Sequence, residues 1–272
     1  MGEIQSQVNY WLILVMNNKG LVSIITPMYK GAAFVGETIE SVLRQTYTDW
    51  EMIIVDDCSP DNGAGIQVVK QYKDPRIKLI ESKVNKGSSG ARNIALHEAQ
   101  GRYIALLDSD DMWPEDYLEK QIDFLNSHDA VIAYGGVQRI DEHTKEKISS
   151  PFPRPKRVDY NSLLKVCPIC PSATVYDSSK CGKYFFNERL GSMRDDYVYW
   201  LDMLKKVPYA HYNPDVVILY RVRQGAVTAN KKKIISSQWK VLREVEHVPY
   251  LKSVYCLFCW GMNGIVKFKL YK

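Results

Sequence analysis

Short apolar segments alternate with segments of helical spacing through the first half of the chain, and no other feature of the sequence restricts the fold as much. The apolar segments are rich in aliphatic and β-branched residues and lie at 21–29, 50–57, 77–81, 102–108 and 130–136. Between them, apolar residues recur at helical intervals, with Ser89 and Pro114 as predicted helix starts. Strands that alternate with helices predict an α/β fold in which helices cover both faces of a mostly parallel sheet.

The alternation ends near residue 140. Segment 149–160 is rich in proline and basic residues, which predicts a loop or lid. A helix is predicted at 195–206 and a strand at 215–223. The lysine-rich segment 230–247 has the pattern of an amphipathic helix. Its predicted apolar side consists of Ile234, Ile235, Trp239, Leu242 and Val245.

Basic residues are concentrated at the C-terminal end. The formal net charge is +5, and residues 231–272 contain nine of the 36 Lys and Arg residues but two of the 31 Asp and Glu residues. Such a tail suits an anionic membrane surface or a nucleic acid, although a solvated helix face is the commoner cause of a charge run. The apolar segment 253–266 is too short to cross a bilayer. It fits either a helix lying among lipid headgroups or a buried terminal helix.

The six cysteines do not form a disulfide framework typical of small secreted proteins. Two pairs, at 167–170 and 256–259, have the CxxC spacing of zinc ligands. The second pair lies in an apolar, aromatic stretch without polar neighbours. Free thiols in a reducing cytosol are therefore predicted in preference to a shared zinc site.

Carboxylates gather where two predicted strands end. Asp108, Asp110 and Asp111 follow one strand, and Asp56 and Asp57 end another. Ligands of parallel α/β sheets sit beyond the carboxyl ends of the strands, so these side chains are expected along one edge. Mg²⁺ or Mn²⁺ takes one or two protein carboxylates and completes its shell with substrate phosphates, which predicts a metal–diphosphate site. The alternative is that an aspartate here only caps the following helix.

The phosphate-binding motifs GxGxxG and GxxxxGK[ST] are absent from the expected positions. Segment 82–96 instead offers small residues followed by Arg92 near a helix start. Its backbone amides and the guanidinium could meet a phosphate or a base edge.

Four ordered stretches carry a specific resemblance. They are SIITPMYKG, QTYTDWEMIIVDDCSPD, NKGSSGARNIAL and YIALLDSDDMWPEDYLEKQ. Together they resemble the successive motifs of the inverting family 2 glycosyltransferases, which have the GT-A fold, over roughly residues 20–230. The resemblance implies a UDP-sugar donor and Mn²⁺ or Mg²⁺ as the cofactor.

The resemblance also implies roles for individual residues. Tyr29 and Asp57 would hold the uracil, in a pocket shaped by Pro27 and Glu37, while Arg92 would assist the base or the diphosphate. Asp108 and Asp110, with Ser109 between them, would be the DxD pair that contacts the ribose and the metal. Asp111 is an alternative metal ligand in their place.

A catalytic base is implied by a further motif. The family usually has an acidic pair at the start of a helix, and RLGSMRDDYVYWLDML presents Asp195 and Asp196 there. Asp196 matches the base that deprotonates the acceptor hydroxyl. Without the resemblance, both residues read as first-turn acids favoured by the helix dipole.

The sequence departs from the family pattern in two places. Many members have a late histidine that reaches the metal or diphosphate, whereas this chain has Arg221 and Arg223 in that stretch. Arginine does not ligate metals but could bind the diphosphate directly. Lys30 replaces the common asparagine after the first-strand tyrosine.

The tail is similar to that of bacterial O-antigen, capsule and teichuronic-acid glycosyltransferases. This similarity implies transfer of one hexose or N-acetylhexosamine to a saccharide linked to undecaprenyl diphosphate, with a β linkage formed. It also implies a cytoplasmic protein bound peripherally to the inner face of the bacterial cell membrane. Nucleic acid is not an expected partner, and a homodimer is left open.

These expectations divide the chain into four parts: an N-terminal extension (1–19), a nucleotide-sugar-binding half (20–112), an acceptor-binding and catalytic-base half (113–230) and a basic, membrane-associating tail (231–272). Residues 1–15 precede Met16 and read as an upstream extension. Two other functions stay open on the residues alone. One is a sugar-phosphate nucleotidyltransferase, and the other is a non-enzymatic nucleotide-binding domain.

Overall fold

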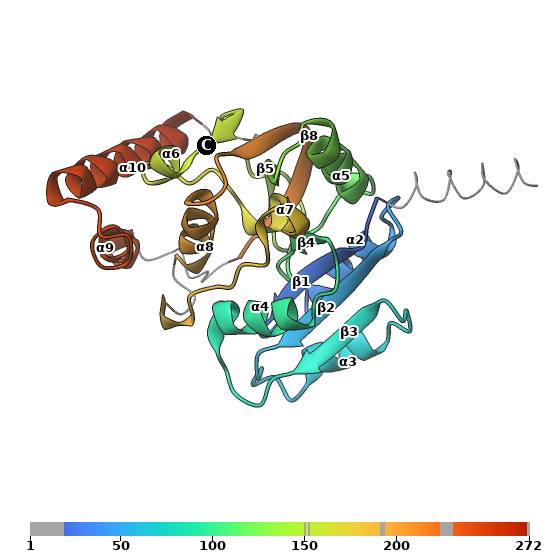
Figure 1. The fold of residues 1–272 in the computed structure, drawn as a ribbon. Helices are drawn as coiled ribbons and strands as arrows, with labels where there is room; N and C mark the ends of the chain where they lie inside the picture. Colours follow the sequence, from blue (N-terminus) through green and yellow to red (C-terminus); the bar gives the residue numbers. More distant parts are fainter. Residues whose placement is uncertain (1–18, 150, 152, 191–193, 224–230, 271–272) are drawn as a thin grey trace, which may run out of the picture.

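An eight-stranded mixed sheet forms the centre of the protein (Figure 1). The computed structural model describes residues 19–149, 151, 153–190, 194–223 and 231–270, so residues 1–18 of the predicted extension lie outside it. The strand order is β3-β2-β1-β4-β7-β5-β8-β6. The strands are β1 (Val22–Met28), β2 (Trp50–Asp56), β3 (Ile77–Glu81), β4 (Tyr103–Leu106), β5 (Ile132–Asp141), β6 (Arg157–Val158), β7 (Thr174–Asp177) and β8 (Ala210–Val222).

The half of the sheet from β3 to β4 is parallel, as the alternating sequence pattern predicts. Strand β7 then runs antiparallel to both β4 and β5, and β6 runs antiparallel to β8. Strands β5 and β8 are parallel to each other. The sheet is therefore mixed beyond β4, and β8 begins at Ala210, five residues before the strand expected at 215–223.

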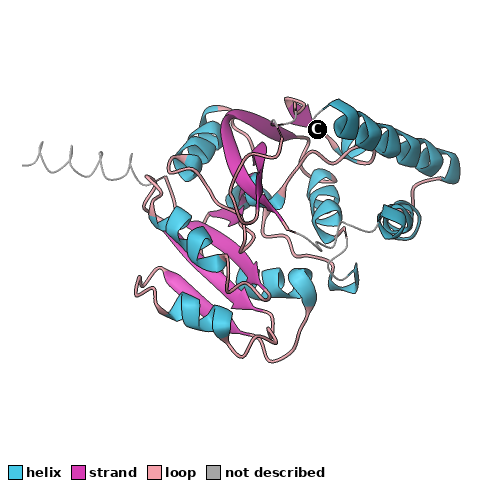
Figure 2. Ribbon diagram, turned by 180° about the vertical axis from the view of Figure 1, so that it is seen from behind, coloured by secondary structure: helices cyan, strands magenta, loops and turns pink. Residues whose placement is uncertain are grey.

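Helices cover both faces of this sheet (Figures 1 and 2). Helices α2 (Val35–Leu43), α3 (Ala64–Lys70) and α5 (Tyr117–Ser127) pack on one face, and α4 (Gly87–Glu98) and α8 (Asp195–Leu204) pack on the other. Neighbouring residues of β1 point to opposite faces, so Ile24 and Ile25 belong to different core clusters. Burial on both faces explains why the strand sequences are continuously apolar.

Two helices begin at residues other than those predicted. Helix α4 begins at Gly87, two residues before Ser89, and the Ser89 hydroxyl donates to the Asp195 carboxylate. Helix α5 begins at Tyr117, since Pro114 belongs to the preceding turn, in which its carbonyl accepts the Tyr117 amide. Shorter helical segments are α6 (Tyr160–Leu163), α7 (Ser178–Cys181), η1 (Pro171–Ala173) and η2 (Glu188–Leu190).

The basic tail folds against the part of the chain formed by residues 113–230. It forms α9 (Lys231–Lys240), the π-helical turn η4 (Val241–Val245) and α10 (Tyr250–Leu270). Leu242 is buried in the same core cluster as α4 and α8. The predicted apolar side of the tail is wrong at Ile235, which is exposed, whereas the polar residue Gln238 is buried.

The terminal helix α10 leaves much of its apolar surface exposed, so the alternative of a buried terminal helix is wrong. No helix among the described residues is both long and apolar enough to span a bilayer. The six cysteines are free thiols, as predicted.

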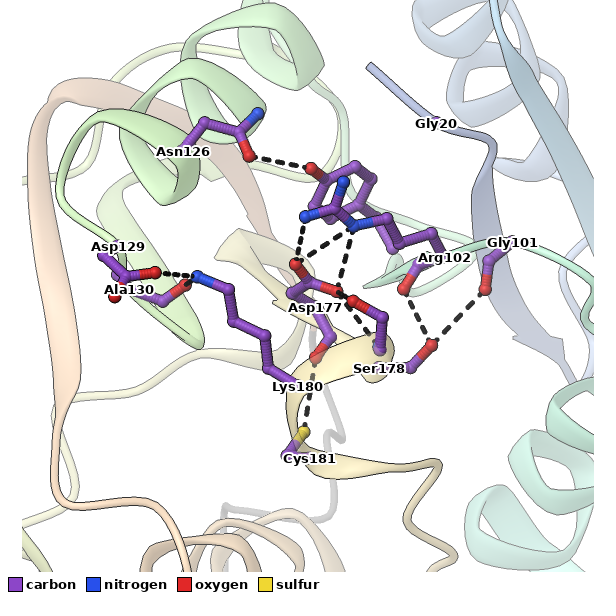
Figure 3. A network of polar contacts seen from close by, with 12 residues as sticks. Gly20, Gly101, Arg102, Asn126, Asp129, Ala130, Asp177, Ser178, Lys180 and Cys181 are labelled. Atoms are coloured by element: carbon purple, nitrogen blue, oxygen red, sulfur yellow. Dashed lines mark hydrogen bonds and ion pairs between the residues drawn. The ribbon is translucent and has the colours of Figure 1, made fainter. Parts of the chain in front are cut away.

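A polar network ties the end of β7 to the start of β4 (Figure 3). It lies at the opposite end of β4 from Asp108, Asp110 and Asp111. The Asp177 carboxylate accepts hydrogen bonds from Arg102, the shortest at 2.6 Å, and from the Ser179 hydroxyl. The Ser178 hydroxyl donates to the Arg102 carbonyl at 2.7 Å. These contacts hold the antiparallel strand β7 in register beside β4.

Candidate active site

Five chain segments meet beyond the carboxyl ends of β1, β2 and β4. Tyr29 follows β1, Asp57 follows β2, and Asp108, Asp110 and Asp111 follow β4. Helix α4 brings Arg92 to this edge, and the start of α8 brings Asp195 and Asp196. The sequence-based prediction that the strand-end carboxylates share one edge agrees with this parallel topology.

Tyr29 and Asp57, the two residues expected to hold the uracil ring, lie at one side of this edge. The Tyr29 ring is exposed, with the Lys30 ammonium 5.5 Å from its centroid. Asp57 is buried, and its Oδ1 accepts the Lys86 amide at 2.7 Å. Burial raises the pKa of Asp57 above its usual range. Pro27 is partly exposed on β1, directly opposite Val55 of β2.

Arg92 joins the aspartates after β4 to the acidic pair on α8. Its Nη2 donates to Asp108 Oδ1 at 2.6 Å, and its Nη1 donates to Asp195 Oδ2 at 3.0 Å. The guanidinium also lies over the Phe186 ring, 5.1 Å from its centroid. Burial opposes the charged form, but the two carboxylates raise the pKa of Arg92 further, so the group stays cationic. Arg92 is thus buried, with both terminal nitrogens held by protein carboxylates.

Asp195 and Asp196 have different surroundings although they are neighbours. Asp195 is buried, and its Oδ2 accepts from Arg92 and from the hydroxyls of Ser88 and Ser89, at 2.8 and 3.1 Å respectively. Asp196 is partly exposed, and its Oδ1 accepts its neighbour's amide, that of Tyr197, at 2.7 Å. Burial, followed by the charge of Asp195, raises the pKa of Asp196. A partly exposed carboxylate with a raised pKa is suited to accept a proton.

The aspartates after β4 also differ in access. Asp108 and Asp110 are partly exposed, while Ser109 is buried. Asp111 is 1% exposed, and its Oδ1 accepts the Arg221 amide at 3.0 Å. Burial, together with the charges of Asp110 and Asp108, holds the pKa of Asp111 well above its usual range.

Arg221 and Arg223, at the end of β8, approach the same loop in different ways. The Arg221 side chain is 1% exposed and donates to the Asp110 carbonyl, the Glu142 carbonyl and the Glu37 carboxylate. The Arg223 side chain is 36% exposed and donates to Asp110 Oδ2 at 3.2 Å. Of the two arginines expected to bind a diphosphate, Arg223 is the accessible one.

Glu37 of α2 lies between two cations. It pairs with Arg221 at 2.7 Å and with Lys145 at 2.9 Å. Although partial burial opposes this effect, the two cations hold the pKa of Glu37 below its usual range. Glu37 also lines a surface depression of about 460 Å³, together with Tyr72 and Lys145.

Asp108 and Asp110 fit a hard divalent cation whose coordination shell is completed by the substrate. Burial, followed by the charge of Asp108, raises the pKa of Asp110, so this pair concentrates negative charge that a cation would offset. No group of three His, Cys, Asp or Glu side chains that could hold a metal occurs in the described part of the chain. Two accessible carboxylates match the number that Mg²⁺ or Mn²⁺ usually takes from a protein beside phosphate oxygens.

Sequence reasoning did not find the contacts of Asp195 with Ser88 and Ser89, or the ion pair between Lys145 and Glu37. The partners of Asp195 lie more than 100 residues away along the chain, at separations of 107 and 106. A serine beside a glycine carries no local signal for such a contact, because the same residues are common in turns.

Comparison with known proteins finds similar sequences and similar folds. The sequence model described as "Glycosyl transferase family 2" matches residues 23–185. A putative teichuronic acid biosynthesis glycosyltransferase of Bacillus subtilis, TuaG, is 35% identical over 92% of this chain and 98% of its own length. The Escherichia coli protein WfgD, named as a UDP-Glc:α-D-GlcNAc-diphosphoundecaprenol β-1,3-glucosyltransferase, is 36% identical over 91% of this chain and 94% of its own.

Two solved structures share the fold. Staphylococcus aureus TarS 1-349, in complex with UDP-GlcNAc, has a TM-score of 0.65 at 16% identity and covers 92% of this chain, which in turn spans 73% of that chain. A mannosyltransferase from Pyrobaculum calidifontis, in complex with GDP-Man and Mn²⁺, has a TM-score of 0.63 at 19% identity. It covers 88% of this chain, which spans 68% of it.

Proposed function

The chain belongs to glycosyl transferase family 2 and is a glycosyltransferase, and from this premise we propose the reaction that it catalyses. It transfers one hexose or N-acetylhexosamine from a UDP-sugar to a saccharide linked to undecaprenyl diphosphate. The anomeric configuration inverts, so a β linkage forms from an α-linked donor. The product is part of a bacterial surface polysaccharide.

One observation carries this proposal more than any other. Arg92 links Asp108, at the expected donor site, to Asp195, which is the residue next to the expected base. A single buried cation therefore neutralises one carboxylate of each group and leaves Asp196 without that partner. A donor site and a proton acceptor held by one rigid network are what direct displacement at an anomeric carbon requires.

In this mechanism, Asp196 removes the proton from the acceptor hydroxyl while the oxygen of that hydroxyl attacks the anomeric carbon of the donor sugar. The attack comes from the face opposite the leaving UDP, which is the origin of the inversion. Tyr29 and Asp57 orient the uracil, and Arg223 binds the diphosphate. A divalent cation, held by Asp110 with Asp108 beside it, would neutralise charge on the departing diphosphate.

The choice of substrates draws on the relatives' names. WfgD and WfaP, at 36% and 35% identity, are named for UDP-Glc and an acceptor carried on diphosphoundecaprenol. We propose the same classes of donor and acceptor here. With a lipid-linked acceptor, the protein works at the inner surface of the bacterial cell membrane. Mn²⁺ or Mg²⁺ is the proposed metal, and the Mn²⁺ in the mannosyltransferase structure supports this class of cofactor.

A donor and acceptor panel tests the proposal. The purified protein is incubated with Mn²⁺ or Mg²⁺, a GlcNAc-diphosphate acceptor bearing a short alkyl chain, and each of the UDP-, GDP- and dTDP-sugars in turn. We expect one UDP-sugar to be transferred, with a β linkage by NMR. Asp196→Asn should lower kcat by about 10²- to 10⁴-fold without loss of the donor-induced thermal shift.

Two results would contradict the proposal. Transfer from a GDP- or dTDP-sugar alone would contradict the donor, and a product with the donor's anomeric configuration would contradict the direct displacement. Asp202→Asn is the matched control, because this exposed carboxylate is on the same helix α8 and pairs only with Lys205 among the described contacts.

A further inference from the structure

Helix α10 presents a stripe of large apolar side chains to solvent. The stripe consists of Leu251, Val254, Tyr255, Phe258 and Met262. Leu251 is 81% exposed and Phe258 is 64% exposed, although both are among the most apolar residue types. The positions are separated by three and four residues, so they lie on one side of the helix. A contiguous exposed apolar surface of this kind usually marks an interaction site.

The opposite side of α10 faces the protein. Ser253 and Cys256 are buried, and the Ser253 hydroxyl donates to the Val248 carbonyl at 3.0 Å. Trp260, on this same side, lies under the guanidinium of Arg194, 5.4 Å from the ring centroid. Arg194 directly precedes Asp195 and Asp196. The inner side of α10 therefore contacts the segment that carries the proposed base.

The position of α10 leaves the stripe open. Helices α9 and α10 lie beside α8, at the end of the molecule farthest from β3 (Figure 1). The ammonium of Lys252 in α10 donates to the Asn161 side chain of α6. The Lys165 ammonium lies 5.8 Å from the Tyr255 ring centroid. Lysines thus flank the stripe at the boundary between helix and protein.

The sequence that contains the stripe carries basic residues and no acidic ones. Residues 248–272 contain four lysines and no Asp or Glu. Amphipathic helices that combine lysine with exposed aromatic and aliphatic residues lie in the headgroup region of bilayers. Anionic lipids attract such segments, with a contribution of about 1 kcal/mol for each basic residue near the surface.

We propose that the α10 stripe docks on an anionic lipid surface. The proposal rests on the proposed function for the lipid-linked acceptor, and it adds the surface and the partner. Docking through α10 would bring the neighbouring Asp196 close to the lipid headgroups, where a diphosphate-linked saccharide is presented. A second copy of this chain is a poorer partner, because pairing two α10 helices would bring like charges together.

Co-sedimentation with vesicles tests the proposal on the full chain. The vesicles contain phosphatidylglycerol and phosphatidylethanolamine and carry no sugar. Phe258→Gln removes the central apolar side chain and should lower vesicle affinity by about tenfold or more. Val84→Gln is the matched control, because it makes the same change at an exposed apolar residue between β3 and α4 and should leave the affinity unchanged. Neutral phosphatidylcholine vesicles should bind the wild-type protein more weakly.

Three results would overturn docking on lipid. They are wild-type protein that stays in solution with anionic vesicles, Phe258→Gln protein that binds as tightly as wild type, and a vesicle-independent dimer that Phe258→Gln dissociates. Turnover on the short-chain acceptor separates this proposal from the proposed function. The Phe258→Gln protein should retain turnover of the short-chain acceptor. If the wild-type protein showed no such turnover, the result would count against the proposed reaction and not against docking.

Discussion

Asp195 and Asp196 show how neighbouring residues of one type acquire different chemistry. Asp195 shares a buried network with Arg92, Ser88 and Ser89, whereas Asp196 stays partly exposed and has a raised pKa. The charge of Asp195 is the second cause of that raised pKa, after burial. The pair therefore combines a buried, ion-paired carboxylate with a carboxylate that accepts a proton more readily.

Asp195→Asn should move the acid limb of the pH profile of kcat/KM to lower pH. The base must be ionised to act, and removal of the Asp195 charge lowers the pKa of Asp196, so Asp196 stays ionised further into acid. The asparagine still accepts from Ser88 and Ser89, so we expect a stability loss of only about 1–3 kcal/mol. Kinetics across pH and urea unfolding measure the two effects. An unmoved acid limb, with Asp202→Asn as the reference, would contradict the assignment of Asp196.

The aspartates after β4 can be separated by the same kind of substitution. Asp110→Asn should lower activity by at least about 100-fold, because this accessible carboxylate is the proposed metal ligand. Asp111→Asn keeps an acceptor for the Arg221 amide and should leave activity within about tenfold of wild type. Manganese titration of both variants checks the metal affinity. If Asp111→Asn lost as much metal affinity as Asp110→Asn, Asp111 would be a ligand.

At the scale of elements, β8 closes the site through two arginines with different tasks. Arg221 is buried and connects the end of β8 to α2 through Glu37 and to the loop after β4 through the Asp110 carbonyl. Arg223 is partly exposed, donates to the Asp110 carboxylate and lies over the Phe34 ring, 5.1 Å from its centroid. The first arginine holds elements together, and the second faces the proposed donor.

Arg221→Ala should therefore affect mainly the stability of the protein, and Arg223→Ala mainly the binding of the donor. Loss of Arg221 leaves two backbone carbonyls without their donor and removes one of the two cations beside Glu37, so it should cost about 1–3 kcal/mol of unfolding free energy. Loss of the partly exposed Arg223 should cost about 1 kcal/mol or less. It should instead raise KM for the UDP-sugar by roughly tenfold, since a charge-assisted hydrogen bond is lost. A stable Arg221→Ala protein with no donor binding would reverse these roles.

At the scale of the whole molecule, the tail is continuous with the core. Val241 and Leu242 are buried in the cluster that includes Ala95 of α4 and Leu201 of α8. The Tyr160 hydroxyl and the Lys205 ammonium, which precede the tail in the chain, both contact the Glu246 carboxylate. The basic segment is thus attached on one side, while α10 exposes the other.

Leu242→Ala tests this attachment. The cavity should cost about 2–5 kcal/mol of unfolding free energy in a single cooperative transition. Ile235→Ala, on the exposed side of α9, should cost about 0.5 kcal/mol or less. Urea unfolding followed by tryptophan fluorescence measures both. Equal and small effects would show that the tail contributes nothing to the stability of the core.

Much of the fold could be predicted from the chain itself. Hydrophobic periodicity located the strands and helices of the first half, because an apolar run buried on both faces and a helix with one apolar side leave different patterns. The order of β7, β5, β8 and β6 left no such pattern. It depends on which strand edges are free to pair after the parallel half has formed, and this is a property of the assembled sheet.

The sequence by itself determined the family, the α/β class and the residue types at the strand ends, because strand ends and motif order are local properties. Only the tertiary structure decided which carboxylates are paired with a cation and which stay accessible. It joins Asp108 and Asp195 through Arg92, buries Asp111 against β8 and leaves Asp110 and Asp196 accessible. The physical reason is that desolvation and charge pairing depend on distance in space, and these partners are separated by up to 110 residues along the chain.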